Sequence, residues 1–583
     1  MPPGRGDKNV MPTMPRIVCD ERKQLYFDVG EFLGKGGFAA CYRLVDKVGT
    51  SYAAKVVGKH LIRTKSHSEK FQLAQEIKIH QKMDHKNIVK LYFAFEDTTN
   101  VYILLELCTR RSLMELLRRR KHVTEPEGRY FVRHLTSACT YIHAHNIVHR
   151  DLKLGNLFLS DDMVLKVGDF GLATNLGDGM KDKNWLCGTP NYIAPEVLAK
   201  KPHTTKVDIW AIGCVLYALI VGIPPFETAN LDKTYKKISQ NDYTLPSTMS
   251  VEAQNLIKIL LSPEPEDRPC ATEIFDTSFM KGFTPKKLPI SCLTTKPVFQ
   301  NDRISSQVDH VFTPQTQPTP TDLAMSNAEP SSPETYLTEL KQQLNELLSK
   351  QLPERSLNDD DLKDPASVPV YWVSKWVDYS AKYGFAYQLC DGSFGTAFCD
   401  KSKLIMEANK DYCQYRSKDN LETFFSVTKC PKEYERKLAL LQDFETYMTH
   451  NLAKTGASMS REGDEIARLP ILQCWIRTKN SVNFLLSNGT YQCNFLSDHS
   501  KLIICPLMGA ATLIDCNQAF HTYKLTTLLS NGAPIELVQR LHYAQNYIKK
   551  MMQVYERNMK HNKHNLTNTP VASVNNTVAG LEV

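Results

Sequence analysis

Three polar side chains with oxygen ligands could carry out metal-assisted chemistry on a phosphate group. Asp151 and Asn156 stand in IVHRDLKLGNLFL, and Asp169 stands in KVGDFGLA. Carboxylate and amide oxygens suit Mg²⁺, which phosphoryl transfer uses to hold nucleotide phosphates. Asp151 would take the proton of a substrate hydroxyl, whereas Asn156 and Asp169 would bind the metal. These residues therefore predict the transfer of a terminal phosphoryl group to an alcohol.

A glycine-rich segment nearer the N-terminus could cover the phosphates of the nucleotide. In EFLGKGGFAACYRL, Gly34, Gly36 and Gly37 lie between two apolar segments that are expected to be strands. Glycine allows the backbone to approach a phosphate closely because it has no Cβ. The last glycine of a G-x-G-x-x-G pattern is replaced by Ala39, so this motif alone is also compatible with a purely structural hairpin.

A lysine and a glutamate follow at positions where they could complete the nucleotide site. Lys55 stands in the expected strand YAAKVV, and Glu76 stands in the helical run FQLAQEIKIHQKM. Lys55 could hold the α- and β-phosphates if Glu76 supplied its counter-charge. An ordinary surface ion pair is the alternative interpretation.

Two later motifs, TPNYIAPE at 189–196 and EPEDRP with Arg268, complete an ordered set that resembles the protein kinases. The resemblance implies a bilobal fold with ATP and Mg²⁺ as cofactors. It also implies that Lys153 steadies the γ-phosphate and that Thr189 braces Asp151 and Lys153, a feature of serine/threonine kinases.

The elements that must position these residues follow from changes in composition along the chain. Residues 26–280 carry dense apolar patterns and are predicted to form the catalytic domain, after a flexible N-terminal arm at 1–25. Residues 281–367 are rich in Pro, Ser, Thr, Gln and Asp, which predicts a linker. Within it, leucines at helical spacing predict a short amphipathic helix over 336–350.

The C-terminal part contains an internal repeat. YQLCDGSFGTAFCDKSKLI at 387–405 aligns with FLLSNGTYQCNFLSDHSKLI at 484–503. Each copy predicts two strands joined at an Asp-Gly or Asn-Gly turn and followed by a helix. Two β-rich units, 368–452 and 466–555, are therefore expected to pack with pseudo-two-fold symmetry, before a polar tail at 556–583. The fold class predicted for the whole chain is α+β.

Several motifs narrow the resemblance to the polo-like kinases. GKGGFAACY, LLELCTRRSL, HRDLKLGNLFL and CGTPNYIAPEVL resemble their catalytic domain, and PVYWVSKWVDYS, LSNGT and DHSKLIICPL resemble their paired polo boxes. The resemblance implies a kinase of cell division that docks on proteins already phosphorylated on serine or threonine, at Ser-pSer/pThr-Pro motifs. It also implies an adenine site, formed by Leu33, Cys41, Ala53, Leu105 and Phe158, with hinge hydrogen bonds from Glu106 and Cys108.

The residue types needed to bind a phosphopeptide are present in the repeat. His499 and Lys501 are alternate residues of an expected strand, so both would face one side and could bind a phosphate. Trp376 offers a flat apolar platform with one N–H donor, and Leu452 adjoins the end of the first expected helix. By resemblance these four residues form the phosphopeptide site. A solvated strand face is the alternative for His499 and Lys501.

One position departs from the family pattern. Polo-like kinases carry a phosphorylatable threonine three residues before the glycine of CGTPNY, and here that residue is Trp185. A phosphothreonine would pair with Arg150 and order the loop. Asp178 or Asp182 could supply a fixed charge instead, or the indole could order the loop by packing. The further alternative is a phosphopeptide-binding scaffold with weak kinase activity. We favour activity without phosphorylation at this position.

Two short segments have both a functional and a plain interpretation. Phosphorylated Ser332, in EPSSPE, could occupy the phosphopeptide site of its own chain, since a tether raises the effective concentration of a ligand. An incidental Ser-Pro sequence is the alternative. The basic run at 118–121 could be a nuclear-import patch or a solvated helix end. A contact between the kinase domain and the polo boxes also stays open.

The overall composition of the chain excludes several classes of protein. Of 583 residues, 42% are hydrophobic and 23% charged, as in ordinary globular proteins, which excludes wholesale disorder. The net charge of +8 is too mild to predict nucleic-acid binding. We expect no membrane span and no secretory signal, and we interpret the 16 cysteines as reduced thiols of a protein of the cytoplasm and nucleus. The family resemblance adds the centrosome, spindle, kinetochore and midbody.

Overall fold

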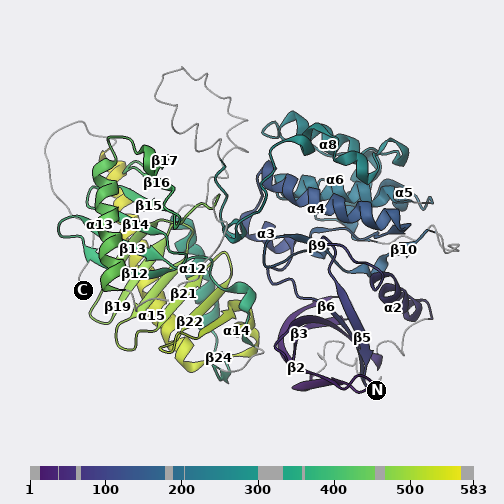
Figure 1. Cartoon of the computed structure of the whole chain (residues 1–583), viewed down its shortest axis with the longest axis horizontal. Helices are drawn as coiled ribbons and strands as arrows, with labels where there is room; N and C mark the ends of the chain where they lie inside the picture. Colours follow the sequence, from purple (N-terminus) through teal and green to yellow (C-terminus); the bar gives the residue numbers. More distant parts are fainter. Residues whose placement is uncertain are drawn as a thin grey trace. The chain divides into compact units, whose positions relative to one another are not determined.

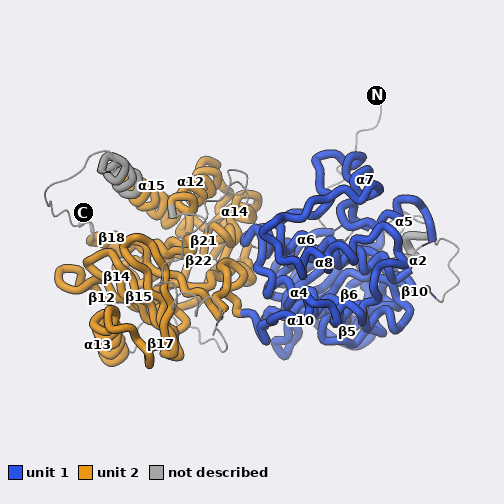
Figure 2. The backbone as a smooth tube through the Cα atoms, turned by 90° about the horizontal axis from the view of Figure 1, so that it is seen from above, with its two compact units in different colours: residues 1–288 blue, residues 289–583 orange. Residues whose placement is uncertain are grey.

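The computed structural model in Figure 1 describes these parts of the chain: residues 14–36, 39–60, 67–176, 188–202, 204–299, 333–357, 362–452 and 466–565. The chain divides into two compact units, Met1–Leu288 and Pro289–Val583, which Figure 2 shows in different colours. The α+β class predicted from the sequence is confirmed, because both units contain antiparallel sheets together with helices.

The first unit begins with a six-stranded antiparallel sheet in the order β1-β2-β3-β4-β6-β5. Its strands are β1 (Ile17–Asp20), β2 (Leu25–Gly36), β3 (Ala39–Asp46), β4 (Ser51–Gly58), β5 (Leu91–Glu96) and β6 (Asn100–Glu106), and α2 (His67–His80) follows β4. The flexible arm predicted for 1–25 is wrong from Ile17 onward. Strand β1 pairs with β2, and its Val18 side chain is buried beside Phe27, so burial of a short apolar segment fixes this part of the chain.

The rest of the first unit is mainly helical. Its helices are α3 (Leu113–Arg120), α4 (Glu125–Ala144), α5 (Pro195–Leu198), α6 (Lys206–Val221), α7 (Leu231–Gln240), α8 (Val251–Leu260), α9 (Ala271–Ile274) and α10 (Ser278–Lys281). Short strands β7 (Ile147–Val148), β8 (Leu157–Leu159), β9 (Leu165–Val167) and β10 (Thr174–Asn175) carry the segments between α4 and α5. Helix α6 is buried from Val207 to Leu219, as expected of a helix that is apolar on every side. It can therefore act as a rigid support for the loops that pack on it.

The basic run at 118–121 closes α3 and is largely used inside the fold. The Arg120 guanidinium binds both carboxylate oxygens of Glu127, at 2.8 and 3.0 Å, and Arg119 lies 3.2 Å from Glu115. The side chains of Arg119 and Arg120 are only 2% and 5% exposed. Two of the four cations are therefore unavailable, and the run does not present the exposed patch that a nuclear-import signal requires.

The second unit contains two six-stranded antiparallel sheets whose strands follow sequence order (Figure 1). The first sheet is β12 (Val373–Tyr379), β13 (Gly384–Leu389), β14 (Phe394–Phe398), β15 (Lys403–Met406), β16 (Tyr412–Arg416) and β17 (Glu422–Ser426). The second is β18 (Leu472–Arg477), β19 (Ser481–Leu486), β20 (Tyr491–Phe495), β21 (Lys501–Cys505), β22 (Ala510–Ile514) and β23 (Phe520–Lys524). The predicted turn glycines Gly392 and Gly489 adopt φ values of 98° and 81°, which favour glycine.

The two sheets pack against each other through a shared apolar core that contains Trp372, Phe385 and Phe484. Reciprocal hydrogen bonds cross this interface: the Gln492 side chain bonds both the N–H and the C=O of Val373, at 2.7 and 2.8 Å. Burial of these backbone groups makes such partners necessary. The two copies of the repeat therefore form one compact body.

Helices cover the outer faces of both sheets. They are α12 (Pro333–Leu348), α13 (Glu435–Asn451), α14 (Leu525–Asn531) and α15 (Ile535–Asn565), with a short parallel pair, β11 (Glu354–Arg355) and β24 (Ala533–Pro534). The helix predicted over 336–350 corresponds to α12. Its Leu337, Leu340 and Leu344 are fully buried in one core with α15, so this part of the predicted linker belongs to the packed fold. An apolar helix face is buried here because it has a partner.

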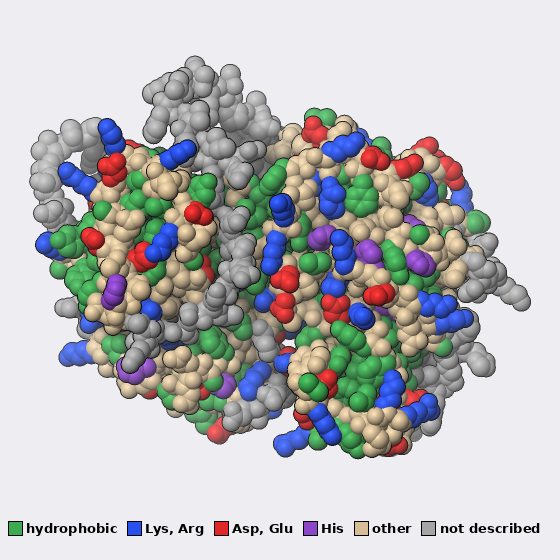
Figure 3. Space-filling view, in the orientation of Figure 1, with side chains coloured by type: hydrophobic (Ala, Val, Ile, Leu, Met, Phe, Trp, Pro, Cys, Tyr) green, Lys and Arg blue, Asp and Glu red, His purple; other side chains and the backbone are tan. Residues whose placement is uncertain are grey.

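The surface carries mixed charge. On the face drawn in Figure 3, Lys and Arg side chains alternate with Asp and Glu side chains over both units. This mixture agrees with the small net charge of +8. In the described parts of the chain, no helix is both long enough and apolar enough to span a membrane.

Candidate functional sites

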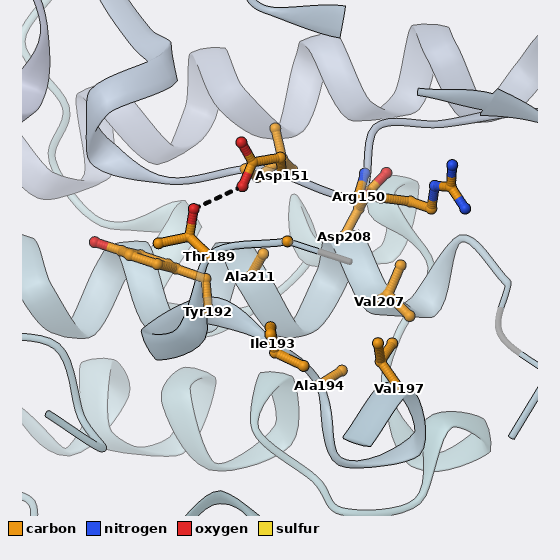
Figure 4. Close-up of a pocket in the computed structure, with 12 residues that line it drawn as sticks. Arg150, Asp151, Thr189, Tyr192, Ile193, Ala194, Val197, Val207, Asp208 and Ala211 are labelled. Atoms are coloured by element: carbon orange, nitrogen blue, oxygen red, sulfur yellow. Dashed lines mark hydrogen bonds between the residues drawn. The ribbon is translucent and has the colours of Figure 1, made fainter. Parts of the chain in front are cut away.

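Asp151 lies in the loop after β7, and its carboxylate is held by Thr189 and Lys153. Thr189 Oγ1 donates a hydrogen bond to Asp151 Oδ1 at 2.8 Å, as Figure 4 shows. Lys153 Nζ lies 2.8 Å from Asp151 Oδ2 and 2.8 Å from Thr189 Oγ1. The structure thus brings together the three residues that the family resemblance connects. This geometry fixes the orientation of the Asp151 carboxylate.

Asn156 links Asp151 to the segment that carries Asp169. The Asn156 amide nitrogen donates to the backbone oxygen and to Oδ2 of Asp151, both at 2.9 Å. Its side-chain oxygen accepts no hydrogen bond from the residues that the structure describes, so it could bind a cation. The backbone oxygen of Asn156 accepts from Gly168 N at 2.9 Å. Asp169 follows in the left-handed conformation, with φ 61°, and its side chain is 45% exposed. The segments that carry the two proposed metal ligands, Asn156 and Asp169, are therefore joined by a backbone hydrogen bond.

Lys55 bridges the sheet and the catalytic segments. Its ammonium lies 2.6 Å from Glu76 Oε1 on α2 and 3.0 Å from Asp169 Oδ1. Burial opposes the charge of Lys55, but the two carboxylates outweigh this effect and raise its pKa. The side chains of Lys55 and Glu76 are only 19% and 10% exposed, which excludes an ordinary surface ion pair.

The remaining nucleotide residues lie on the sheet next to Lys55. Cys41 pairs with both Gly34 and Lys55 across neighbouring strands, and Ala53 pairs with Leu105. A Cβ added at Gly34 or Gly36 would meet nothing within 4 Å, so the space over both glycines is open for a ligand. Gly37 lies outside the described residues. Leu33 lies near the end of β2, and Glu106 is the last residue of β6. Cys108 follows β6, and Phe158 lies on β8.

Two of these residues contact basic side chains. The backbone oxygen of Leu33 accepts a hydrogen bond from Arg111 at 3.1 Å, and the Glu106 carboxylate pairs with Lys166 at 2.9 Å. Burial raises the pKa of the Cys108 thiol to about 12, so this side chain stays neutral. A neutral, half-buried thiol next to the sheet suits the apolar ring of a purine.

Asp208 is a functional residue that the motif analysis missed. It lies on α6, is 1% exposed, and accepts hydrogen bonds from the backbone N–H groups of His149 and Arg150, both at 2.9 Å. These bonds anchor the loop that precedes Asp151. One acidic residue within the apolar helix sequence VDIWAIGCVLYALIV was the available signal, since buried carboxylates require partners.

A pocket adjoins Asp151 and Thr189 on the side of α6 (Figure 4). The guanidinium of Arg150 points away from Asp151 in this view, and its Nε donates to Leu172 O at 2.7 Å. Most of the other lining side chains are apolar: Ile193, Ala194, Val197, Val207 and Ala211. The proposed base thus stands at the edge of an apolar surface.

The strand geometry predicted for His499 is wrong. His499 lies in the turn before β21, with φ 59°, and only Lys501 belongs to the strand, so their alternation does not place them on one face. Lys501 Nζ crosses to β12 and donates to Ser374 O at 3.2 Å. Burial lowers the pKa of Lys501 to about 8. The Ser374 hydroxyl is buried and has no hydrogen-bond partner among the described residues.

Trp376 lies on β12 and stacks on Phe385, with ring centroids 5.8 Å apart. The Arg477 guanidinium, which the sequence analysis did not single out, lies 5.6 Å from the Trp376 ring. Leu452 ends α13 and packs on the apolar core below that helix. The structure thus connects Lys501 to the strand of Trp376, while the meeting of Leu452 and His499 with that strand stays a prediction.

The first copy of the repeat contains a lysine equivalent to Lys501, but its surroundings differ. Lys403 Nζ binds the side-chain oxygen of Gln473 at 2.8 Å and its backbone oxygen at 3.3 Å. Gln473 and Ser374 occupy equivalent positions, because each lies at the register shift of the first strand of its sheet. Lys403 is therefore held by a side chain as well as a backbone carbonyl, whereas Lys501 bonds a backbone carbonyl.

Comparisons with known proteins identify the two kinds of domain in this chain. The protein kinase domain model matches residues 27–280, and the POLO box duplicated region matches residues 381–438 and 478–541. Serine/threonine-protein kinase PLK1 of Xenopus tropicalis is 44% identical over 569 residues, which cover 94% of this chain and 95% of that protein. The chain belongs to the polo-like kinase family.

Relatives in other animals match this polo-like kinase to the same extent. Serine/threonine-protein kinase plk-1 of Caenorhabditis elegans is 44% identical over 576 residues, 93% of this chain and 88% of the relative. Serine/threonine-protein kinase polo of Drosophila melanogaster is 43% identical over 565 residues, 93% of this chain and 97% of the relative. The polo-like kinase described here is therefore a serine/threonine protein kinase, and kinases in general use ATP with Mg²⁺.

Proposed function

We propose that the first unit transfers the γ-phosphoryl group of ATP to serine and threonine hydroxyls with Asp151 as the base. The observation that supports this most strongly is the continuous set of contacts from Glu76 through Lys55 to Asp169, together with the bonds that fix Asp151. Phosphoryl transfer depends mainly on positioning and on electrostatic stabilisation. These residues could supply both the positioning and the electrostatic stabilisation.

The residues also fit a nucleotide-bound magnesium ion. Mg²⁺ bound to ATP would neutralise charge that develops on the phosphates, and it prefers a few protein oxygens together with phosphate oxygens. The Asn156 side-chain oxygen and the Asp169 carboxylate would hold it, and Lys55 would hold the α- and β-phosphates. Lys153 would steady the γ-phosphate. Thr189 would keep Asp151 and Lys153 in place through its two hydrogen bonds.

Activity without phosphorylation at the position of Trp185 is part of this proposal. Trp185, Asp178 and Asp182 lie outside the described residues. Arg150, the residue that a phosphothreonine would bind, already donates its Nε to the backbone oxygen of Leu172. The loop that carries Arg150 therefore has anchors that need no phosphate.

We expect phosphatase-treated protein to retain most of its turnover of casein with MgATP. Turnover is measured beside untreated protein and beside the Asp151→Asn variant. Complete loss after phosphatase treatment would show that another phosphorylated residue controls the loop. If untreated protein were as inactive as Asp151→Asn, the phosphopeptide-binding scaffold would be the better description of this chain.

We further propose that the polo boxes dock the kinase on proteins already phosphorylated at Ser-pSer/pThr-Pro motifs, in the setting of cell division. Lys501 would bind the phosphate, with His499, Trp376 and Leu452 around the peptide. The Ser374 hydroxyl, which has no partner within the described segments, supports this site, since buried polar groups normally have partners and a ligand oxygen could serve as one. Ser332 lies outside the described residues, so its docking within the chain remains a hypothesis.

Phosphopeptide binding is expected to weaken above pH 8. Burial places the pKa of Lys501 at about 8 in the free protein, and a phosphate binds the ammonium form. The phosphate remains a dianion above pH 7, so deprotonation of Lys501 lowers the affinity as the pH rises. We expect about a tenfold loss between pH 7 and pH 9, measured by fluorescence polarisation.

The Lys501→Arg variant is the control, because a guanidinium keeps its charge at pH 9. Its affinity ratio between pH 7 and pH 9 should stay near one, whatever its absolute affinity. An equal loss in both proteins would assign the titration to another group.

A further inference from the structure

The turn that carries His499 has a backbone shape that needs support. It connects β20 to β21, and His499 is exposed at its tip with φ 59°. The left-handed region is disfavoured for residues with a Cβ, so a non-glycine residue remains there when other contacts hold it. A histidine that binds a phosphate must also be presented in a fixed place.

Arg540 on α15 supplies such contacts to both neighbours of His499. Its Nη2 donates to Asp498 Oδ2 at 2.6 Å, and its Nη1 donates to Ser500 Oγ at 2.5 Å. The other oxygen of Asp498 accepts from the N–H and the hydroxyl of Ser500, at 3.0 and 2.7 Å. The Arg540 guanidinium lies 4.5 Å from the Phe495 ring, and its side chain is 13% exposed. The planar guanidinium of Arg540 therefore connects the Asp498–Ser500 turn to α15 through two hydrogen bonds.

The ion pair between Arg540 and Asp498 stays ionised at neutral pH, and nearby carboxylates balance the charge of Arg540. Burial opposes the ionised form of Asp498, but hydrogen bonds from Arg540 and Ser500 outweigh it and lower the pKa of Asp498 to about 2. Glu536 also accepts from Arg540, at 2.9 Å. Two carboxylates therefore compensate the charge of Arg540. Its effect on a phosphate should come from the shape of the turn rather than from its charge.

The first copy of the repeat contains the same arrangement with different residues. Lys437 on α13 donates to Asp400 Oδ2 at 2.7 Å and to Ser402 Oγ at 2.6 Å, and it lies 5.4 Å from the Phe398 ring. The tip of that turn is Lys401, with φ 70°. Lysine can therefore hold this turn, and the chain provides a matched control.

We propose that Arg540 is a positioning residue of the phosphopeptide site, which holds the Asp498–Ser500 turn in the shape that presents His499 to the phosphate. This inference rests on the proposed docking function. It assigns a role to a residue of α15 that need not touch the peptide.

The test measures binding of a fluorescent Ser-pThr-Pro peptide to the full chain by polarisation, with the unphosphorylated peptide alongside. Arg540→Met should weaken binding about tenfold, because it removes the bonds from α15 to both neighbours of His499. Arg540→Lys should stay within about threefold of the unaltered protein, since one lysine, Lys437, makes the same two hydrogen bonds in the first copy. Lys437→Met should leave the affinity unchanged.

A double-mutant cycle separates positioning of His499 from general damage to the fold. In a His499→Ala background, Arg540→Met should change the affinity by less than about twofold, because the group that it positions is absent. The inference is overturned if Arg540→Met binds like the unaltered protein, or if its loss is equally large without His499.

A melting curve shows whether the Arg540→Met variant is folded. If it is not, Asp498→Asn replaces it in the test. This variant removes the ion pair but keeps an acceptor for Ser500, and it should weaken binding at least about threefold. Unchanged affinity would contradict the inference. Failure of the docking function itself has a different signature, because the unaltered chain would then bind phosphorylated and unphosphorylated peptides equally.

Discussion

Asp151→Asn is expected to lower kcat about a thousandfold while the affinity for MgATP changes little. The amide cannot accept the proton of the substrate hydroxyl, whereas Lys55, Asn156 and Asp169, which are proposed to hold the nucleotide, are unaltered. The amide oxygen can still accept from Thr189, which now bonds Oδ1 at 2.8 Å, although the amide nitrogen no longer accepts from Lys153 and Asn156. The backbone bonds from His149 and Arg150 to Asp208 do not involve this side chain, so they should hold the loop in place. Single-turnover phosphorylation of casein and titration with a fluorescent nucleotide give the two quantities.

Thr189→Ala is the matched comparison for this variant. It removes a bond to the base without removing the base, so its loss should be clearly smaller than that of Asp151→Asn. Comparable turnover of the Asp151→Asn variant and the unaltered enzyme would refute the assignment of Asp151. Loss of nucleotide binding in that variant would instead show that Asp151 contributes to the metal site.

Joint replacement of His499 by Ala and Lys501 by Met is expected to weaken phosphopeptide binding at least about a hundredfold, since charge-assisted hydrogen bonds to the phosphate are removed. The melting temperature should not fall. His499 is exposed, and a buried ammonium with a lowered pKa costs stability that methionine does not. Isothermal titration and a melting curve measure the two effects.

The equivalent pair in the first copy, Lys401→Ala with Lys403→Met, is the control. Lys403 is bound by Gln473, so this pair should retain the affinity of the unaltered chain. Equal losses in both double variants would assign the effect to the fold of the repeat. Unchanged binding in the His499 and Lys501 variant would refute the site.

The catalytic residues could be predicted because short motifs fix both residue type and local geometry. Asp151, Lys153 and Asn156 lie in one segment, and the contacts among them follow from a single loop. The pairing of Lys55 with Glu76 was also predicted, since a buried cation requires a counter-charge. Long-range partners such as Asp208 leave a much weaker trace in the sequence.

The errors have specific physical causes. In SDHS, the Asp498 side chain bonds the backbone of Ser500 and favours a turn over an extended strand, so the alternating pattern at His499 was misleading. Arg540 and Gln473 act on turns and strands far away in the sequence, and no local pattern indicates their partners. Strand β1 escaped prediction because four residues carry little periodicity.

The bond between Gln473 and Lys403 bears on how many phosphorylated proteins the two polo boxes can bind at once. Duplication created two equivalent lysines, but the chain fills one of the two places with its own amide. If the other captures one primed protein, titration should give a stoichiometry of one and an isotherm without cooperativity. The kinase would then be delivered to one anchor at a time, and bridging two anchors would take two copies of the enzyme.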